Sequence, residues 1–224
     1  MKTRILRSPA DLTAQDILAL YANFDTPITG LDCGEKCAPH NPSGKPFCCD
    51  ICHAVPAAYQ SEWASLQTRT QLWHIWRGDE CASPDNRDDL ENSLPDGMLF
   101  LACLGPQACQ RQHRLLSCRQ FPFFPYVTSD YRFLGLVYDW EFEKQCWVIN
   151  NLAQVTPAYR TQFIATYDQI FALFQDEFES YALRSQEMRA HFAAQHRRIP
   201  LLHRNGGCHL ISPVSERARR VASC

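Results

Sequence analysis

The sequence lacks the features that mark a membrane-spanning or a secreted protein. No run of roughly 18 apolar residues occurs in the 224-residue chain, which excludes a transmembrane helix. The N-terminal segment 1–9 is basic, but it lacks the apolar stretch and the small-residue cleavage site of a signal peptide. We therefore predict a cytoplasmic protein.

The sequence also lacks an excess of charge of either sign. Lys and Arg total 22, Asp and Glu total 24, and the formal net charge is −2. Such a balance favours no polyanionic partner, so we predict no nucleic-acid binding and no membrane association. A phosphate-binding loop, a dinucleotide fingerprint and a Ser-His-Asp order are absent as well. Composition and motifs therefore leave open whether the protein is an enzyme.

Cysteine is abundant, with 12 residues in the chain. In the cytosol disulfides are rare, and a cysteine pattern more often binds a metal or carries catalysis. Cys81, Cys146, Cys208 and Cys224 are scattered and fit buried thiols. The remaining eight cysteines fall into two groups, which calls for a different explanation.

The periodicity of apolar residues predicts a mixture of helices and strands. Residues 12–24 and 57–76 have helical spacing, and residues 98–103 and 131–140 have the character of buried strands. Between the two predicted helices, residues 25–56 carry Pro, Gly, Asn, Asp and five cysteines, with few large apolar side chains. This segment is expected to be irregular.

An amphipathic helix is predicted over 156–200, because Thr156 is a good N-cap and Pro157 suits the first turn. An unbroken helix of that length would span about 63 Å, more than a compact domain of this size allows. It must break near Ser185, where the apolar stripe is interrupted, or protrude, or meet a partner protein. The segment 201–224 is expected to be a mobile basic tail.

The predicted fold class is therefore α+β. We expect a small, irregular, cysteine-rich metal-binding core with a short sheet, packed by helices that include the long C-terminal one. The expected organisation is a cysteine-cluster domain over 1–155, the long helix or helix pair over 156–200, and the tail over 201–224.

The cysteine groups have the spacing of a metal site. The candidate metal ligands are Cys33, Cys37, Cys48, Cys49, Cys52, Cys103, Cys109 and Cys118. Ordering a loop costs about 1–2 kcal/mol per residue, and residues 25–56 have little apolar surface to offset that cost. A structural zinc supplies roughly 10–16 kcal/mol of apparent binding energy. Disulfides and buried thiols are the alternatives to ligation. Adjacent side chains diverge in an extended chain, so only one of Cys48 and Cys49 is expected to bind a given ion.

Two features connect these cysteines to a known family. The first is the N-terminal group with a vicinal pair at Cys48–Cys49, and the second is the turn Cys118-Arg119-Gln120-Phe121-Pro122. With Cys103-Leu104 between them, this run resembles the YkgJ-like cysteine-cluster family, a zinc- or iron-chelating domain also described by its CxxCxxCC motif. The resemblance covers roughly residues 30–150. It implies a metal centre built from cysteines of both groups.

Two metal centres fit eight thiols. Four thiolates can hold a [4Fe–4S] cluster, or all eight can form two tetrahedral Zn²⁺ sites. The flagellin lysine methylases look like distant relatives with an iron–sulfur cluster, which makes such a cluster plausible here. Arg119 is a candidate to donate hydrogen bonds to sulfur, and its alternative is a surface cation.

We accordingly expect a cytosolic metal-binding protein with a structural, metal-handling or redox role. One alternative is an iron–sulfur-dependent enzyme that modifies a protein or small molecule. The other is a metal-stapled interaction module, whose C-terminal helix binds a protein partner.

Overall fold

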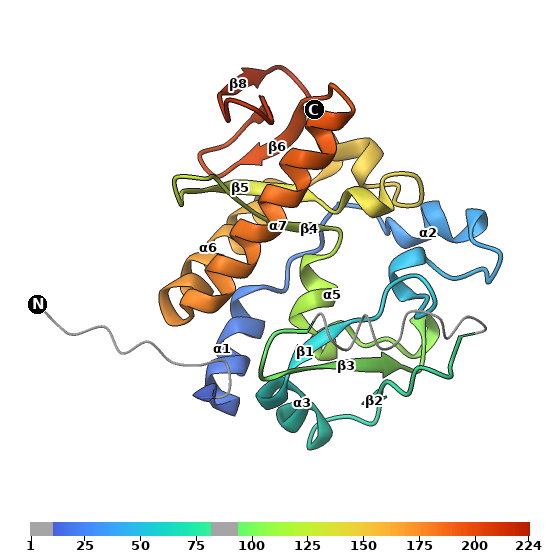
Figure 1. Ribbon diagram of the computed structural model, residues 1–224. Helices are drawn as coiled ribbons and strands as arrows, with labels where there is room; N and C mark the ends of the chain where they lie inside the picture. Colours follow the sequence, from blue (N-terminus) through green and yellow to red (C-terminus); the bar gives the residue numbers. More distant parts are fainter. Residues whose placement is uncertain (1–10, 82–93) are drawn as a thin grey trace, which may run out of the picture. The chain divides into compact units, whose positions relative to one another are not determined.

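The computed structural model describes residues 11–81 and 94–224, and these form two compact units (Figure 1). The first, which we name the sheet unit, contains residues 26–31 and 121–224. The second, the cysteine unit, contains the described residues of 7–25 and 32–120. This division differs from the expected boundary at residue 155. None of the described helices is long and apolar enough to cross a bilayer.

The sheet unit is built on a five-stranded antiparallel sheet in the order β4-β5-β6-β7-β8. The strands are β4 Phe123–Val127, β5 Phe133–Tyr138, β6 Ile199–His203, β7 Cys208–Ile211 and β8 Ala218–Val221. The predicted strand at 131–140 is thus confirmed. The expected mobile tail over 201–224 is wrong, because this segment contains the end of β6 and all of β7 and β8. Its basic residues lie in an exposed edge strand, where no apolar alternation marks a strand in the sequence.

Two helices, α6 Pro157–Leu173 and α7 Gln175–Ala194, follow the sheet's first two strands in the chain. The predicted start is confirmed, since the Thr156 hydroxyl accepts a hydrogen bond from the Tyr159 amide at 3.2 Å. The predicted break near Ser185 is wrong, because the chain bends at Phe174, which is extended and 1% exposed. Ser185 is buried inside α7, and its hydroxyl accepts from the Val127 amide at 3.0 Å, which joins α7 to β4.

The cysteine unit carries a three-stranded antiparallel sheet with β3 in the centre. Its strands are β1 Ala57–Tyr59, β2 Trp73–Ile75 and β3 Met98–Cys103. Its helices are α1 Ala14–Asn23, α2 Gly34–Cys37, α3 Gln60–Gln67 and α5 Leu116–Gln120. Short 3-10 turns lie at Ala38–His40, Phe47–Cys49, Pro106–Ala108 and Arg111–His113. The predicted strand at 98–103 and the helix near 12–24 are confirmed.

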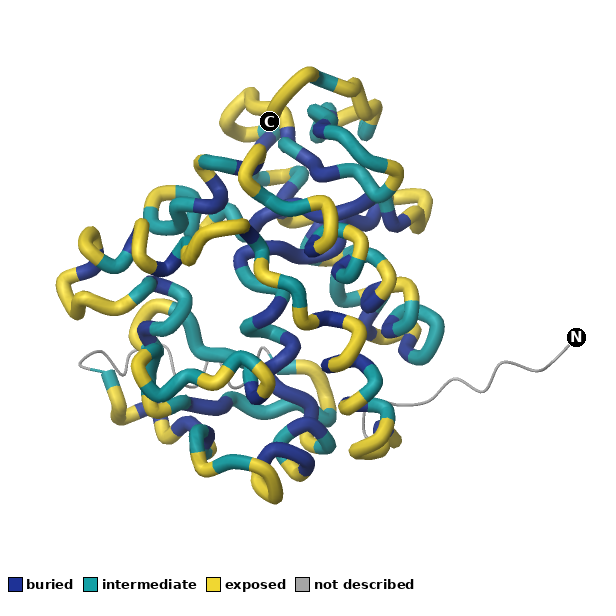
Figure 2. Tube along the Cα trace, turned by 180° about the vertical axis from the view of Figure 1, so that it is seen from behind, coloured by how far each residue is buried: buried dark blue, intermediate teal, exposed yellow. Residues whose placement is uncertain are grey.

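The helix predicted over 57–76 is wrong in part. Only residues 60–67 are helical, and they are flanked by β1 and β2. Helical spacing is real within α3, but Trp73 pairs with Cys103 across the sheet, and that long-range pairing overrides the local pattern. In Figure 2 the buried positions run along the strands and the inner sides of helices, whereas exposed positions gather in the turns.

Candidate metal centre

The N-terminal cysteine group lies in a loop that polar contacts hold together. Asp50 is 6% exposed and accepts hydrogen bonds from the Ser43 hydroxyl at 2.6 Å and the Asn41 amide at 3.0 Å. Burial opposes ionisation of Asp50, but these hydrogen bonds outweigh it and lower the pKa of the carboxyl group. The carboxylate therefore orders the chain immediately before and after the vicinal cysteines.

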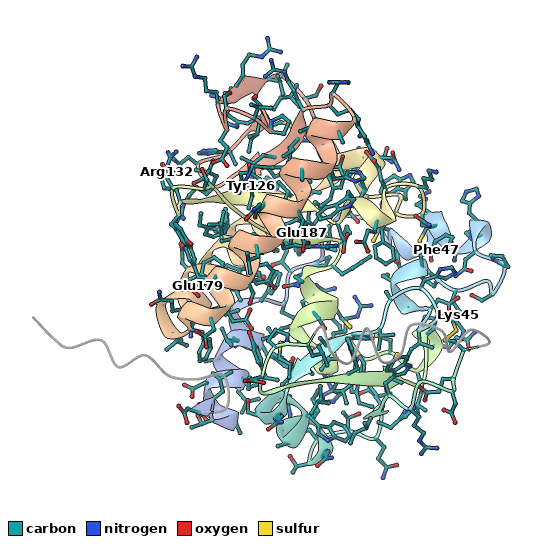
Figure 3. The ribbon with its side chains drawn as sticks, viewed as in Figure 1. Lys45, Phe47, Tyr126, Arg132, Glu179 and Glu187 are labelled. Carbon is teal, nitrogen blue, oxygen red and sulfur yellow. A yellow bond between two sulfur atoms is a disulfide. The ribbon has the colours of Figure 1, made fainter. Side chains whose placement is uncertain are left out.

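Each cysteine of this group has a defined place. Cys33 is the N-cap of α2, and Cys37 is buried at its last position, where its Sγ donates to the Gly34 carbonyl at 3.6 Å. Cys48 and Cys49 follow Phe47, which is labelled in Figure 3, and their sulfur atoms are 3.9 Å apart. Because they lie in a 3-10 turn rather than an extended strand, their side chains do not diverge as expected.

The second group comes from the end of the central strand and the segment after it. Cys103 is the last residue of β3, Cys109 follows a 3-10 turn, and Cys118 lies in α5. All three side chains are partly buried. The antiparallel pairing of β3 with two neighbours fixes where this strand ends, and with it the position of Cys103.

Four thiols from the two groups lie close enough to affect each other's ionisation. Burial raises the pKa of Cys118, and the negative charges of Cys49 and Cys103 raise it further. Burial likewise raises the pKa of Cys103, with added contributions from the charges of Cys49 and Cys109. These charge effects link Cys49, Cys103, Cys109 and Cys118, which we name the thiol cluster. They come from segments more than 50 residues apart in the chain.

Cys49 ionises more readily than an ordinary thiol, in contrast to Cys103 and Cys118. A hydrogen bond from the Cys48 thiol lowers the pKa of Cys49 to about 7, and the positive charge of Arg114 also lowers it, against the opposing effect of burial. A thiol with this pKa is substantially a thiolate at neutral pH, which is the form that binds metals and reacts as a nucleophile.

The arginine that donates a hydrogen bond to a thiol of the cluster is Arg114, whereas Arg119 was predicted. The Arg114 Nε donates a hydrogen bond to the Cys109 Sγ at 3.2 Å, and the charges of Cys109, Cys49 and Cys118 all raise the pKa of its guanidinium group against burial. Sequence reasoning missed Arg114, because no spacing signal distinguishes it from other arginines of the same segment.

Arg119 has a structural role instead of the expected contact with sulfur. Its guanidinium is 6% exposed and donates to carbonyl oxygens of Tyr21, Phe24 and three residues of the 111–114 segment. It also pairs with Asp25 at 3.0 Å and lies 4.3 Å from the centre of the Tyr21 ring. The predicted hydrogen bond from Arg119 to sulfur and the alternative of a surface cation are therefore both wrong. It joins the end of α1 to the turn that precedes α5.

Cys52, which was expected to be a ligand, forms a disulfide with Cys81, with their Cα atoms 5.4 Å apart. A sulfur in a disulfide is not a thiolate and does not ligate a metal in this form. A second disulfide joins Cys208 to Cys224, with Cα atoms 5.5 Å apart, whereas both were expected to be buried thiols. The sequence positions of these cysteines form no motif that would predict the Cys52–Cys81 or the Cys208–Cys224 disulfide.

The thiol cluster does not have the arrangement of a formed metal site. Within residues 11–81 and 94–224, no group of three or more Cys, His, Asp or Glu side chains is placed to hold a metal ion. His53, the histidine nearest the vicinal pair in sequence, packs edge-on against the Phe47 ring at 5.1 Å. The charges of the four thiols affect one another's pKa values. To bind one metal, their side chains would have to turn so that the four sulfur atoms face a common point.

Comparisons of the chain with protein-family models, curated proteins and solved structures gave no match. The resemblance to the YkgJ-like family therefore rests on the motif residues alone and stays a prediction.

Proposed function

We propose that this protein binds a soft metal centre, an iron–sulfur cluster or Zn²⁺, through the thiol cluster. The observation that carries the proposal is the mutual charge effect of Cys49, Cys103, Cys109 and Cys118, which come from two distant segments, together with the hydrogen bond from Arg114 to Cys109 at 3.2 Å. Four sulfur donors are the ligand set that a [4Fe–4S] cluster and a structural zinc share.

The electrostatics of the cluster support a bound cation. The charge of each thiolate disfavours ionisation of its neighbours, and burial adds to that cost. A metal centre among the four sulfurs would turn this repulsion into attraction, because ligation stabilises the thiolate form. Arg114 offsets part of the negative charge through its hydrogen bond to Cys109.

One centre fits the chain better than two. Two tetrahedral zinc sites need eight thiolates, and Cys52 is paired with Cys81, which leaves seven of the eight predicted ligands. Cys33, Cys37 and Cys48 then lie outside the set of four sulfur donors. Cys48 favours ligation by Cys49 through its hydrogen bond.

The test is anaerobic purification followed by elemental analysis and a visible spectrum. Broad visible absorption that dithionite bleaches would identify an iron–sulfur cluster, and a colourless protein with about one zinc per chain would identify a zinc site. A well-folded sample that holds neither iron nor zinc would contradict the proposal.

Matched cysteine variants assign the ligands. Cys118→Ser and Cys109→Ser are expected to lose most of the bound metal, since each removes one of four sulfur donors. Cys146→Ser, in the sheet unit, is expected to keep the wild-type metal content. Cys109 serves as the second variant because Cys118 lies inside α5, where a substitution also affects folding. Wild-type metal content in both variants would refute the assignment.

A further inference from the structure

The sheet unit contains a cavity that the proposed metal centre does not use. Its volume is about 450 Å³, within the range typical of small-molecule sites. Its walls come from the turn before β5 and the first residue of β5, from the end of α6 and from the beginning of α7. The lining residues that matter here are Tyr131, Phe133, Asp168, Phe171, Phe178 and Glu179.

Four aromatic rings form one side of this cavity. The Phe171 ring lies 4.8 Å from that of Phe178 and 5.4 Å from that of Phe133, at interplanar angles of 90° and 87°. Tyr131 stacks on Phe178 at 6.0 Å and is 63% exposed. Rings at right angles and at these distances pack edge to face, which fixes their positions in the cavity wall. Aromatic rings that line a cavity attract a cation to their faces.

The polar residues of the cavity are acidic. Asp168 and Glu179 each contribute a carboxylate to the lining. Asp168 is paired with Arg204 at 2.8 Å, and the Arg204 guanidinium lies 5.2 Å from the centre of the Phe133 ring. The Arg204 guanidinium therefore contacts both the Phe133 ring and the Asp168 carboxylate at the edge of the cavity.

Glu179 leaves the cavity with a net negative charge. It accepts a hydrogen bond from the Gln175 side-chain amide at 3.0 Å, which orients the carboxylate without neutralising it. In the part of the chain that the structure describes, no basic side chain forms a salt bridge with Glu179. Two carboxylates and one guanidinium give a charge of −1 beside the four rings.

We infer that this cavity binds a quaternary ammonium group. Aromatic faces attract a cation, and the carboxylate selects against anions. A methylated ammonium is poorly hydrated and needs no hydrogen-bond acceptors in the cavity, so it suits aromatic walls better than a primary amine does. The same head group occurs on small free molecules such as choline and on the side chain of trimethylated lysine.

Calorimetric titration of the full chain at low ionic strength tests this inference. Choline is the first probe, and its uncharged isostere 3,3-dimethylbutan-1-ol is the control for apolar binding. A peptide with one trimethyllysine, compared with the unmodified peptide, separates the two sources. We expect choline or the trimethyllysine peptide to bind at least about tenfold more tightly than its control. Equal binding of probe and control, or no binding of any probe, would overturn the inference.

Variants on one helix locate the site. Glu179→Gln is expected to weaken binding about two- to fivefold, because it removes one exposed ion pair with the ligand's ammonium group. Glu187→Gln is the matched control, because Glu187 lies two turns further along α7, pairs with Arg184 and does not line the cavity (Figure 3). Both glutamates are exposed, so neither change should disturb folding. If Glu179→Gln and Glu187→Gln bind the probe with the same affinity, the ligand does not bind beside Glu179.

Tyr131→Asn tests the aromatic wall. Tyr131 has a φ of 59°, a left-handed conformation that asparagine tolerates well, so the backbone should be retained. Loss of this ring is expected to weaken binding by about two- to fivefold, with no change in thermal stability. If the Tyr131→Asn variant binds the probe as tightly as the wild type does, the Tyr131 ring does not contact the ligand.

Discussion

The two units of this chain are stabilised in different ways. The sheet unit buries large aromatic and aliphatic side chains between its helices and strands, among them Phe163, Phe192 and Leu201 at 0% exposure. The cysteine unit also has an apolar core, with Ile17, Leu20 and Leu66 at 0% exposure, and each unit carries one disulfide. Burial of apolar surface stabilises both units. The cysteine unit differs in its buried charged groups, such as Glu62 and Arg119, and in the metal that we propose for it.

Buried ionisable groups show the same contrast. In the cysteine unit, Glu62 is 1% exposed and accepts hydrogen bonds from the Tyr21 hydroxyl at 2.7 Å and the Leu116 amide at 2.8 Å. Arg119 satisfies carbonyl groups at the end of α1. In the sheet unit, Arg184 and Arg197 form their ion pairs nearer the surface. Removing a single polar side chain should therefore affect the cysteine unit more.

The largest expected difference follows removal of the metal by a chelator. The cysteine unit should lose hydrogen-exchange protection in β3 and α5, because an apparent binding energy on the order of 10 kcal/mol is withdrawn from it. The amides of β5 and β6 should keep their protection. Equal loss in both units would show that the metal stabilises the whole chain, and no loss in either would show that the cysteine unit folds without it.

A smaller effect is expected from Arg119→Leu. This change leaves several buried carbonyl oxygens without a donor, and we expect the free energy of unfolding of the cysteine unit to fall by about 3–5 kcal/mol. Arg119→Lys should recover little, since an ammonium cannot reproduce the planar set of donors.

Chemical denaturation followed by hydrogen exchange measures the Arg119 effect in each unit. Arg132→Leu is the control: Arg132 is exposed, pairs with Asp130 at 2.7 Å and lies in the sheet unit. That variant should lose less than about 1 kcal/mol, as surface ion pairs do. A similar loss in both arginine variants would contradict the contrast between the units.

The third effect is a pH dependence that comes from Glu62. Burial raises the pKa of Glu62 from 4.5 to about 7. Between these values the folded protein binds a proton that the unfolded chain has released, so the stability contributed by this group falls as pH rises from about 4.5 to 7 and is then constant. The total change is about 3 kcal/mol.

Glu62→Gln should remove this dependence, because the amide stays neutral at every pH. The measurement is the free energy of unfolding of both proteins at several pH values from 4.5 to 8, with Glu187→Gln as control. Parallel curves for the wild type and Glu62→Gln would mean that Glu62 does not carry the buried proton.

The sequence predicted those elements whose signals are local. The Thr13 cap with Asp16 three residues later marks the start of α1, and both reciprocal hydrogen bonds form. Thr156 and Pro157 mark α6 in the same way, and apolar runs mark β3 and β5.

Elements fixed by distant partners could not be predicted in this way. The bend at Phe174 brings the Tyr167 and Tyr181 hydroxyl groups to 3.0 Å, a contact between two helices that no single helical pattern contains. β8 is an exposed, arginine-rich edge strand that exists through its pairing with β7. Trp73 belongs to β2 because Cys103 lies opposite it.

The metal site itself stays a prediction. Cysteine spacing identified two groups, and the charges of Cys49 and Cys103, one from each group, both raise the pKa of Cys118. The assignment of Cys52 as a ligand was wrong, because its partner Cys81 lies 29 residues away in a polar segment without a motif. Arg114 and Glu62 were missed, since their roles depend on what surrounds them in three dimensions.

X-ray absorption at the iron or zinc edge of the anaerobically purified protein tests the central claim most directly. If the thiol cluster holds the metal, the nearest shell consists of sulfur alone, at about 2.3 Å. A shell of nitrogen or oxygen, or a folded protein without iron or zinc, would contradict the claim that these cysteines share one metal centre.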